Sequence, residues 1–156
     1  MDTTSEQPVI EDDRITTFGR LIETHALLTH SLDNELRQAV GIPLLWFGVL
    51  LHVARSPNQI RPISELVAAT AFTNGGVTRL VDRMEAAGLV ERLPCPSDRR
   101  VHWVGLTEQG RDLLQRGAEV HLQGIQRRIV DVLDADERAS LDAILVKLLG
   151  TADACR

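Results

Sequence analysis

Arginine side chains in the middle third of the chain are well suited to binding a planar or anionic partner. Arg79 follows Thr78 in a segment where apolar residues recur every three or four positions, and Arg99 and Arg100 follow a proline-rich stretch. A guanidinium group presents several donors in one plane, so it can bond twice to the edge of a guanine or to a phosphate. These residues therefore indicate a nucleic-acid surface; the alternatives are a solvated helix face and two hydrated surface arginines.

Two short helices are expected to position the first of these residues. Residues 64–70 are predicted to form one helix, and the hydroxyl of Thr73 is predicted to cap the next. The apolar positions of that second helix share one face: Val77, Leu80, Val81 and Met84. The helix is expected to end at Gly88, which tolerates a left-handed cap. Thr78 and Arg79 then lie on the opposite face.

The period of the sequence changes after Gly88. Residues 89–93 are β-capable, residues 94–98 contain two prolines that exclude a helix, and residues 99–106 alternate as a strand does. Two helices followed by a hairpin make a winged helix, in which the second helix enters the major groove and the hairpin reaches alongside it.

Three pieces of this segment resemble the MarR family of bacterial regulators, in the family's order and spacing. They are residues 77–90, the triplet Asp98-Arg99-Arg100, and residues 106–110. The resemblance covers roughly residues 12–150. It implies a homodimeric winged-helix repressor or activator that binds DNA, and members of the family are often released from DNA by small phenolic ligands, oxidants or metals.

The resemblance also implies roles for the charged triplet. Arg100 matches the family's residue that enters the minor groove, and Asp98 matches the residue that holds it. A narrow minor groove concentrates negative potential, which suits an arginine. On the helix, the amides of the first turn favour a phosphate, and Arg83, one turn beyond Arg79, is expected to touch phosphate or to pair with a carboxylate. The expected DNA-binding residues are Thr73, Asn74, Gly75, Thr78, Arg79, Arg83, Asp98, Arg99 and Arg100.

The distribution of charge qualifies this expectation. The chain has a formal net charge of −5. Residues 61–100 sum to +1, whereas residues 1–60 sum to −4 and residues 101–156 to −2. The expected DNA-binding segment is therefore the least acidic part without being a strong basic patch. We expect binding to depend on geometry and dimerisation more than on bulk charge.

Composition places the protein in the cytoplasm. Cys95 and Cys155 make no disulfide framework, which favours a reducing compartment. The N-terminal residues are acidic and lack the apolar core of a signal peptide, and the longest apolar run, residues 43–54, is too short to span a bilayer. We therefore expect no membrane association.

The predicted fold is mainly α with a small β-hairpin wing (α+β). The expected parts are a disordered acidic tail (1–11), a dimerisation helix (12–42), a winged helix-turn-helix DNA-binding module (43–106) and C-terminal dimerisation helices (107–156). Residues 44–54 are apolar almost all round and should be buried, and residues 55–62, with two prolines, are expected to form a loop. The terminal helices have more apolar face than one small module can cover, so we expect a homodimer.

Local signals define the C-terminal helices. Thr107 is predicted to cap a helix that extends to about residue 133, with an apolar stripe of Leu114, Ala118, His121, Ile125 and Val132. Gly110, Gly117 and Gly124 recur in it every seven residues, which reflects either close approach of another helix or mere tolerance. Asp134 to Glu137 resembles a capping box, and the last helix, with its apolar face at Leu141, Ile144, Leu145 and Leu148, is expected to close at Gly150.

A ligand pocket follows only from the resemblance. The family's ligands bind between the dimerisation helices and the winged module, so Arg20, His25 and Trp46 are the candidates for its wall, facing a small aromatic or phenolic effector. Trp46 is otherwise a core residue, and His25 and His121 otherwise pack as polar members of apolar stripes.

Metal and redox sensing remain open alternatives. No two histidines form an i, i+4 helical pair with a carboxylate or cysteine between them, so no metal site is expected. Some family members sense zinc, so a site assembled across helices is the alternative. Cys95 could sense oxidant, but the family's peroxide sensors carry their cysteine near the first helix, and between two prolines a small turn residue is the simpler interpretation.

No enzyme is indicated. The sequence has no phosphate-binding P-loop and no GxGxxG, GxSxG or HExxH motif, so we expect neither catalytic residues nor a cofactor. The sequence predicts a regulator that binds a pseudo-palindromic DNA operator as a homodimer, most simply as a repressor. A metal- or redox-responsive version of it, and a winged helix that binds only protein, are the alternatives; in the latter Arg79, Arg99 and Arg100 would be dispensable.

Overall fold

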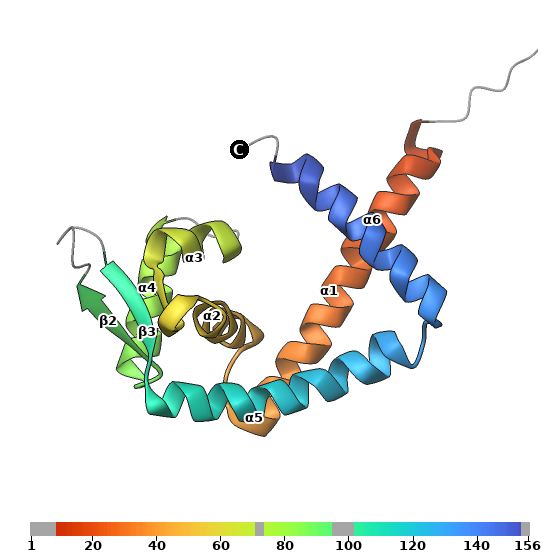
Figure 1. The fold of residues 1–156 in the computed structure, drawn as a ribbon. Coiled ribbons are helices and arrows are strands. Elements are labelled where there is room, and N and C mark those ends of the chain that lie inside the picture. The colour runs from red at the N-terminus through yellow and green to blue at the C-terminus, as the bar shows by residue number, and fades with distance from the viewer. Residues whose placement is uncertain (1–8, 71–73, 95–101, 154–156) are drawn as a thin grey trace, which may run out of the picture.

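The computed structural model describes residues 9–70, 74–94 and 102–153 (Figure 1). Its α-helices are α1 (Asp13–Val40), α2 (Leu44–Ala54), α3 (Ile63–Thr70), α4 (Asn74–Ala86), α5 (Glu108–Ile125) and α6 (Ala135–Asp153). Its strands are β1 (Ile60–Pro62), β2 (Val90–Pro94) and β3 (His102–Leu106), and its short helical turns are η1 (Val9–Glu11), η2 (Pro57–Gln59) and the π-helical η3 (Gln126–Val130). The predicted class, mainly α with a small antiparallel sheet, is confirmed.

The elements divide into two regions joined by one helix (Figure 1). α2, α3, α4 and the sheet gather at one end of the molecule, α1 and α6 cross at the other, and α5 runs between the two regions. Among the described residues no single helix is long and apolar enough to cross a membrane, and α1 with α2 passes that test only as a pair bent by 82°.

The sheet has one strand that the sequence did not predict. Its order is β1-β3-β2, with both pairs antiparallel, and β1 forms one edge. The prediction of a plain loop over residues 55–62 was therefore wrong, because Ile60 to Pro62 pair with β3. Three residues are too few to show a period of two, and the proline is tolerated because an edge strand needs fewer ladder donors.

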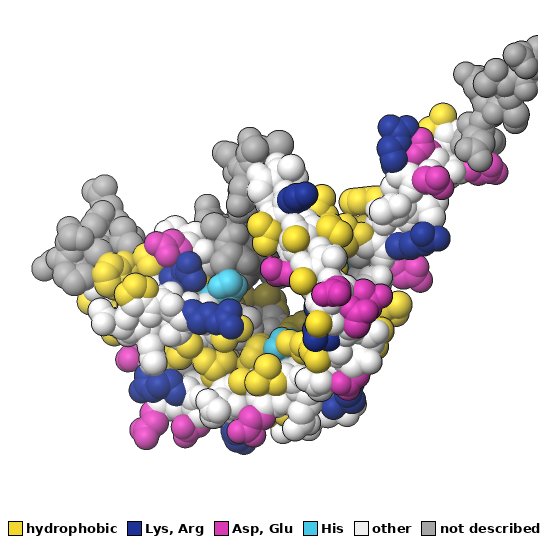
Figure 2. All heavy atoms as spheres, turned by 45° about the vertical axis from the view of Figure 1, so that its right-hand side comes forward, with side chains coloured by type: hydrophobic (Ala, Val, Ile, Leu, Met, Phe, Trp, Pro, Cys, Tyr) yellow, Lys and Arg dark blue, Asp and Glu magenta, His cyan; other side chains and the backbone are white. Residues whose placement is uncertain are grey.

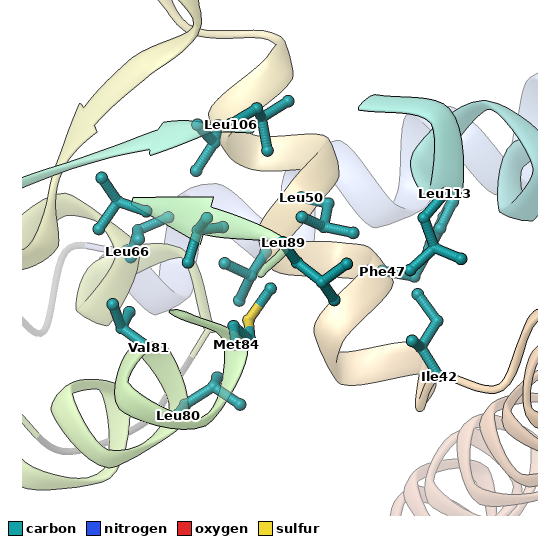
Figure 3. Packing of buried hydrophobic residues seen from close by; sticks show 14 of the residues in the cluster. Ile42, Phe47, Leu50, Leu66, Leu80, Val81, Met84, Leu89, Leu106 and Leu113 are labelled. Carbon is teal, nitrogen blue, oxygen red and sulfur yellow. The ribbon is translucent and has the colours of Figure 1, made fainter. Parts of the chain in front are cut away.

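The core lies between α2, α4 and the sheet. Val77, Leu80, Val81 and Met84 of α4 are each at most 1% exposed, as their spacing predicted. Figure 3 shows the labelled residues of α4 on the side of the helix that faces α2 and α3. Phe47 and Leu50 of α2 are likewise buried, which confirms the expectation that this helix is the structural centre. The outer face of α4 is thereby fixed in position.

Two predicted helix ends are confirmed at the junction of α4, β2 and α5. Gly88 takes φ +73°, its amide donates to the carbonyl of Glu85 at 2.8 Å, and the amide of Leu89 donates to the carbonyl of Met84 at 3.0 Å. This is a Schellman cap, which needs a left-handed residue. The Thr107 hydroxyl accepts from the first turn of α5 and donates to the carbonyl of Gly88 at 2.6 Å, so one side chain ties both helix ends together.

The start of α6 is also as predicted, but its end is not. The amide of Glu137 donates to Asp134 and the amide of Asp134 donates to Glu137, each at 2.9 Å, which is a capping box. α6 then continues past Gly150 to Asp153. Gly150 does not adopt a positive φ, so it does not end the helix as Gly88 does.

α5 differs from its predicted course at its C-terminal end. Regular α-helix stops at Ile125 and gives way to the π-helical turn η3, instead of running to about residue 133. Val132, assigned to the apolar stripe, is 68% exposed. A π turn inserts a residue into the repeat, so apolar positions beyond it leave the face that a 3.6-residue period assigns to them.

The three glycines of α5 are sites of close approach, which decides between the two interpretations of their spacing. A Cβ on Gly110 would lie 1.9 Å from the carbonyl oxygen of Leu89, and one on Gly117 would lie 3.1 Å from the ring of Phe47. At Gly124 a Cβ would lie 2.5 Å from Leu32 of α1. α5 therefore packs closely against the winged region with its first half and against α1 with its second.

Candidate nucleic-acid interface

The outward face of α4 carries the residues expected to read DNA. Thr78, Arg79 and Arg83 are exposed, on the side of the helix opposite its buried residues. Gly75 in the first turn is exposed too, and nothing lies within 4 Å of the place where its Cβ would be. Gly75 therefore adds no side chain to the first turn of α4, where backbone amides are expected to favour a phosphate.

Several of the expected DNA-binding residues cannot be placed. Thr73, Asp98, Arg99 and Arg100 lie outside the described residues, as does Cys95. Asn74 begins α4, but its side chain is not among those described.

Arg92 on β2 joins the wing to α4, a role that the sequence analysis missed. Its Nη1 pairs with Glu85, and its Nη2 lies 2.6 Å from Asp82 Oδ1. Nη2 also donates to the carbonyl of Thr78 at 3.4 Å, and the Arg92 amide donates to Glu85 at 3.1 Å. The strand that begins the wing is thus bonded to three residues of α4, which sets the angle between hairpin and helix.

The same contacts change the electrostatics of the outward face. Both carboxylates on α4 are paired with Arg92, whereas Arg79 and Arg83 form no ion pair within the part of the chain that the structure describes. Arg79, Arg83 and Arg92 against Asp82 and Glu85 still sum to +1, so the pairing changes where the charge is directed and leaves the net charge of this face unchanged. Arg83 was expected either to touch phosphate or to pair with a carboxylate, and no such pair is found among the described residues.

The residues proposed for a ligand pocket lie on two helices, α1 and α2. Arg20 and His25 are exposed on α1, where five positions place two side chains about 140° apart around a helix. Trp46 is half-buried on α2, which follows the far end of α1 (Figure 1). His25 was expected to pack as a polar member of an apolar stripe. It is exposed in the single chain instead.

His121, by contrast, is packed as predicted. Its ring lies 4.9 Å from that of Phe47, between centroids, and its Nδ1 is buried without a hydrogen-bond partner among the described residues. Burial lowers the pKa of the His121 imidazole, and the charge of Glu35 only partly opposes this. Burial therefore favours the neutral form of this imidazole.

Glu35 ties α1 to the π-helical turn beyond α5. Its Oε1 accepts from Arg128 at 2.8 Å and from Arg127 at 2.9 Å. The hydrogen bond from Arg128 is the largest influence on the pKa of Glu35, and it holds that pKa below the ordinary value although partial burial raises it. This contact fixes the terminal helices relative to the winged region through α5.

Histidines do not cluster with carboxylates or cysteines in the described parts of the chain. Within residues 9–70, 74–94 and 102–153, no group of three or more such side chains is arranged to hold a metal ion.

Helix α4 presents its arginines outward, is bonded to the hairpin that follows it, and packs against α2 and α3 on its other side. This is the arrangement of a winged helix-turn-helix that enters a DNA groove. The fold and the interface thus define the class: a winged-helix DNA-binding protein.

Comparisons with known proteins identify the family. The model of the MarR family matches residues 40–101. The Multiple antibiotic resistance protein MarR of Escherichia coli is 33% identical over 137 residues, which cover 88% of this chain and 94% of that protein. The regulator PecS of Dickeya dadantii is 29% identical over 143 residues, covering 90% and 84%. The chain belongs to the MarR family.

Solved structures agree. Sco3205, a MarR-family regulator from Streptomyces coelicolor solved in complex with DNA, superposes with a TM-score of 0.84 at 28% identity, covering 90% of this chain and 91% of that one. A mutant MarR from E. coli complexed with operator DNA gives a TM-score of 0.73 at 28% identity, covering 92% and 99%. The protein is a DNA-binding transcriptional regulator.

Proposed function

We propose that the protein acts in the cytoplasm as a homodimeric repressor, which binds a pseudo-palindromic operator and leaves it when a small aromatic or phenolic ligand binds. In this proposal residues 43–106 form the DNA-binding module, residues 12–42 and 107–156 form the dimerisation part, and residues 1–11 form an acidic tail. The observation that carries the proposal is the outward face of α4, whose two carboxylates are paired with Arg92 and whose Arg79 and Thr78 are exposed.

Each expected contact has a physical basis. Arg79 reads a base edge in the major groove, because a guanidinium can bond twice to guanine. Arg83 and the first turn of α4, with Thr73, Asn74 and Gly75, hold phosphates and fix the register. Arg100 enters the minor groove beside Arg99, held by Asp98.

Dimerisation is supported by apolar side chains that the single chain leaves exposed. On α1, Phe18 is 63% and Ile22 is 52% exposed, and on α6, Ile144 is 55% and Leu149 is 66% exposed. Figure 2 shows such side chains gathered on the crossing helices. Phe18 and Leu21 of α1 line a groove of about 520 Å³ together with Ile144 and Leu148 of α6. A soluble monomer rarely exposes so much contiguous apolar surface, and a second copy would cover it.

The test of the base contact is Arg79→Ala. The variant is expected to lose about 1 to 3 kcal/mol of binding free energy on the operator and to relax preference at one base position, because a bidentate contact carries sequence information. Its loss on random DNA should be smaller. Competition gel shifts with the promoter beside its own gene, and with single-base variants of it, measure both quantities. Arg116→Ala, on the exposed side of α5, is the matched control.

The wing is tested separately. Arg100→Ala should weaken operator binding most where the flanking sequence is A·T-rich, and Asp98→Ala should have a milder effect of the same kind. If these variants and Arg79→Ala all bind the operator like the wild type while the dimer stays folded, the winged module is not the DNA surface. The protein-binding alternative then holds.

A further inference from the structure

A second hollow lies beside the winged region, at the edge of the sheet away from α4. It has a volume of about 430 Å³ and is lined by the loop after α2, by β1, by Glu65 and by Trp103 of β3. Ligand pockets in proteins have volumes of about 300 to 1,000 Å³. β1 is the edge strand opposite β2, the strand that Arg92 bonds to α4, so the hollow is separate from the face that carries Arg79.

Two arginines give the hollow a positive charge. Arg55 is exposed and forms no ion pair among the described residues. Arg61 donates from Nε to Glu65 at 3.1 Å and from Nη1 to the carbonyl of His52 at 3.3 Å, which leaves Nη2 available. Glu65 is the one carboxylate among the lining residues. Burial, and after it the charges of Arg61 and Arg55, lowers the pKa of the neighbouring His52.

The walls of the hollow combine a flat apolar surface with a strained loop. Trp103 lies opposite Pro62 in the β1–β3 register, so an indole and a pyrrolidine ring border the same space. Asn58 and Gln59 both adopt φ +56°, which is rare for residues other than glycine. Asn58 lines the hollow, and residues in this conformation cluster at functional sites, ligand clamps among them. The side chain of Gln59 accepts from Arg111 of α5 at 3.5 Å, which links the loop to that helix.

We propose that this hollow binds a small planar organic anion, whose carboxylate lies between Arg55 and the open edge of Arg61 and whose ring lies against Trp103. A guanidinium pair matches a carboxylate in geometry, and the indole supplies a stacking surface. A DNA backbone is convex and contacts protruding side chains, so a concave site at the edge away from α4 suits a small ligand better. Any effect of the ligand on DNA rests on the proposed function; its binding does not.

Trp103 allows binding to be measured without DNA. The chain has two tryptophans, so Trp46→Phe leaves Trp103 as the only indole. Titration of this variant with benzoate is expected to change its fluorescence and to saturate. Arg55→Gln should weaken binding roughly tenfold or more, as expected when a charge-assisted hydrogen bond is lost. Arg116→Gln, an exposed arginine of α5, is the matched control and should leave binding unchanged.

Two analogues separate the parts of the ligand. Cyclohexanecarboxylate keeps the charge and removes the flat ring, and benzamide keeps the ring and removes the charge; both should bind more weakly than benzoate. If inorganic phosphate competes as well as benzoate does, the site holds an anion without a ring and the proposal is overturned. If Trp46→Phe does not fold, calorimetry of benzoate with the wild type and Arg55→Gln gives the same decision.

Other outcomes also overturn the proposal. Loss of benzoate binding in Arg20→Gln but not in Arg55→Gln would place the ligand near α1. A second outcome combines two results: benzoate does not bind, and in Arg55→Gln the slope of log DNA affinity against log salt concentration is reduced by about one unit. Together they would make Arg55 a phosphate contact. Both results can be obtained whether or not the operator assignment holds, so failure of this inference is distinguishable from failure of the proposed function.

Discussion

Two arginines at the interface have opposite surroundings and therefore opposite roles. Arg79 extends from α4 without an ion pair in the described structure, which leaves its donors available to a base. Arg92, 23% exposed at its side chain, is committed to Asp82 and Glu85. An arginine that neutralises carboxylates next to a DNA surface favours binding without touching DNA, because it removes repulsion between those carboxylates and phosphate.

Arg92→Met is therefore expected to weaken DNA binding on every sequence equally, while preference for the operator is retained. It should also lower the free energy of unfolding by about 1 to 2 kcal/mol, since charged hydrogen bonds at a partly exposed site are lost. Anisotropy titrations and urea denaturation measure the two effects. Adding Asp82→Asn to Arg92→Met should recover part of the DNA affinity. No recovery in the double variant would show that Arg92 acts by some other means.

At the scale of the element, α5 is the helix whose glycines fix its distance from its neighbours. At Gly110 the added methyl group of an alanine would meet the backbone oxygen of Leu89, which cannot turn away as a side chain can. At Gly48 of α2 nothing lies within 4 Å of the added atom. The two positions are a matched pair, since both lie inside helices and neither has a positive φ.

Gly110→Ala should destabilise the protein by about 1 to 3 kcal/mol through overpacking. Gly48→Ala should instead stabilise it by about 0.5 to 1 kcal/mol, because alanine has the higher helix propensity. Thermal and urea unfolding of both variants measure the difference. Equal effects at the two sites would mean that the close approach of α5 to Leu89 does not constrain the fold.

Helix α5 also makes stability depend on pH through His121. Because its pKa is lowered in the folded chain, the unfolded chain binds protons that the folded chain excludes. Stability should be constant above pH of about 6.5, the ordinary histidine value, and should fall as the pH decreases below it. His121→Phe should reduce this loss, whereas the exposed His25→Gln should not. Urea midpoints from pH 8 to 5 test this, and a midpoint that rises toward pH 5 would contradict it.

Glu35 adds a second loss at lower pH. Its pKa is depressed by Arg128, so its contribution is present above the ordinary glutamate value of about 4.3 and disappears as the pH falls through the folded value. Glu35→Gln should remove this acid-range component. Because the charge of Glu35 opposes the lowering of the His121 pKa, the variant should also enlarge the component near pH 6.

At the scale of the whole molecule, the apolar surface of α1 and α6 determines the assembly. Ile144→Asp places a charge in the groove that Phe18 and Leu148 also line. We expect the variant to sediment as a monomer and to lose operator affinity, because two joined readers must span half-sites about 34 Å apart. Gln115→Asp adds the same charge at an exposed polar position of α5 and should remain dimeric. A wild type that sediments as a stable monomer would overturn the dimer.

Effector control is a property of the same assembly. A chelator should leave DNA affinity unchanged, and Cys95→Ser should bind DNA under peroxide as the wild type does. A chelator effect with stoichiometric bound metal would favour the metal-responsive alternative. A peroxide response that disappears in Cys95→Ser would favour the redox-responsive one.

The sequence by itself determined the elements whose signals are local. The inward face of α4 follows from the spacing of its apolar residues, and Gly88, Thr107 and Asp134 each cap a helix through bonds to residues within a few positions. Such features depend on backbone geometry that adjacent residues set, so they can be predicted from the order of residue types. The exposed position of Arg79 is part of the same inference.

Only the tertiary structure decided what joins distant parts of the chain. The three residues of β1 are too few to show a period and become a strand because β3 lies beside them. The pairing of Arg92 with α4, and the neighbours of the glycines of α5, depend on how packed elements are oriented. For the same reason Arg55 and Trp103, which are far apart in sequence, border one hollow that the sequence did not predict. Contacts between elements arise from packing, for which the order of residues contains no local signal.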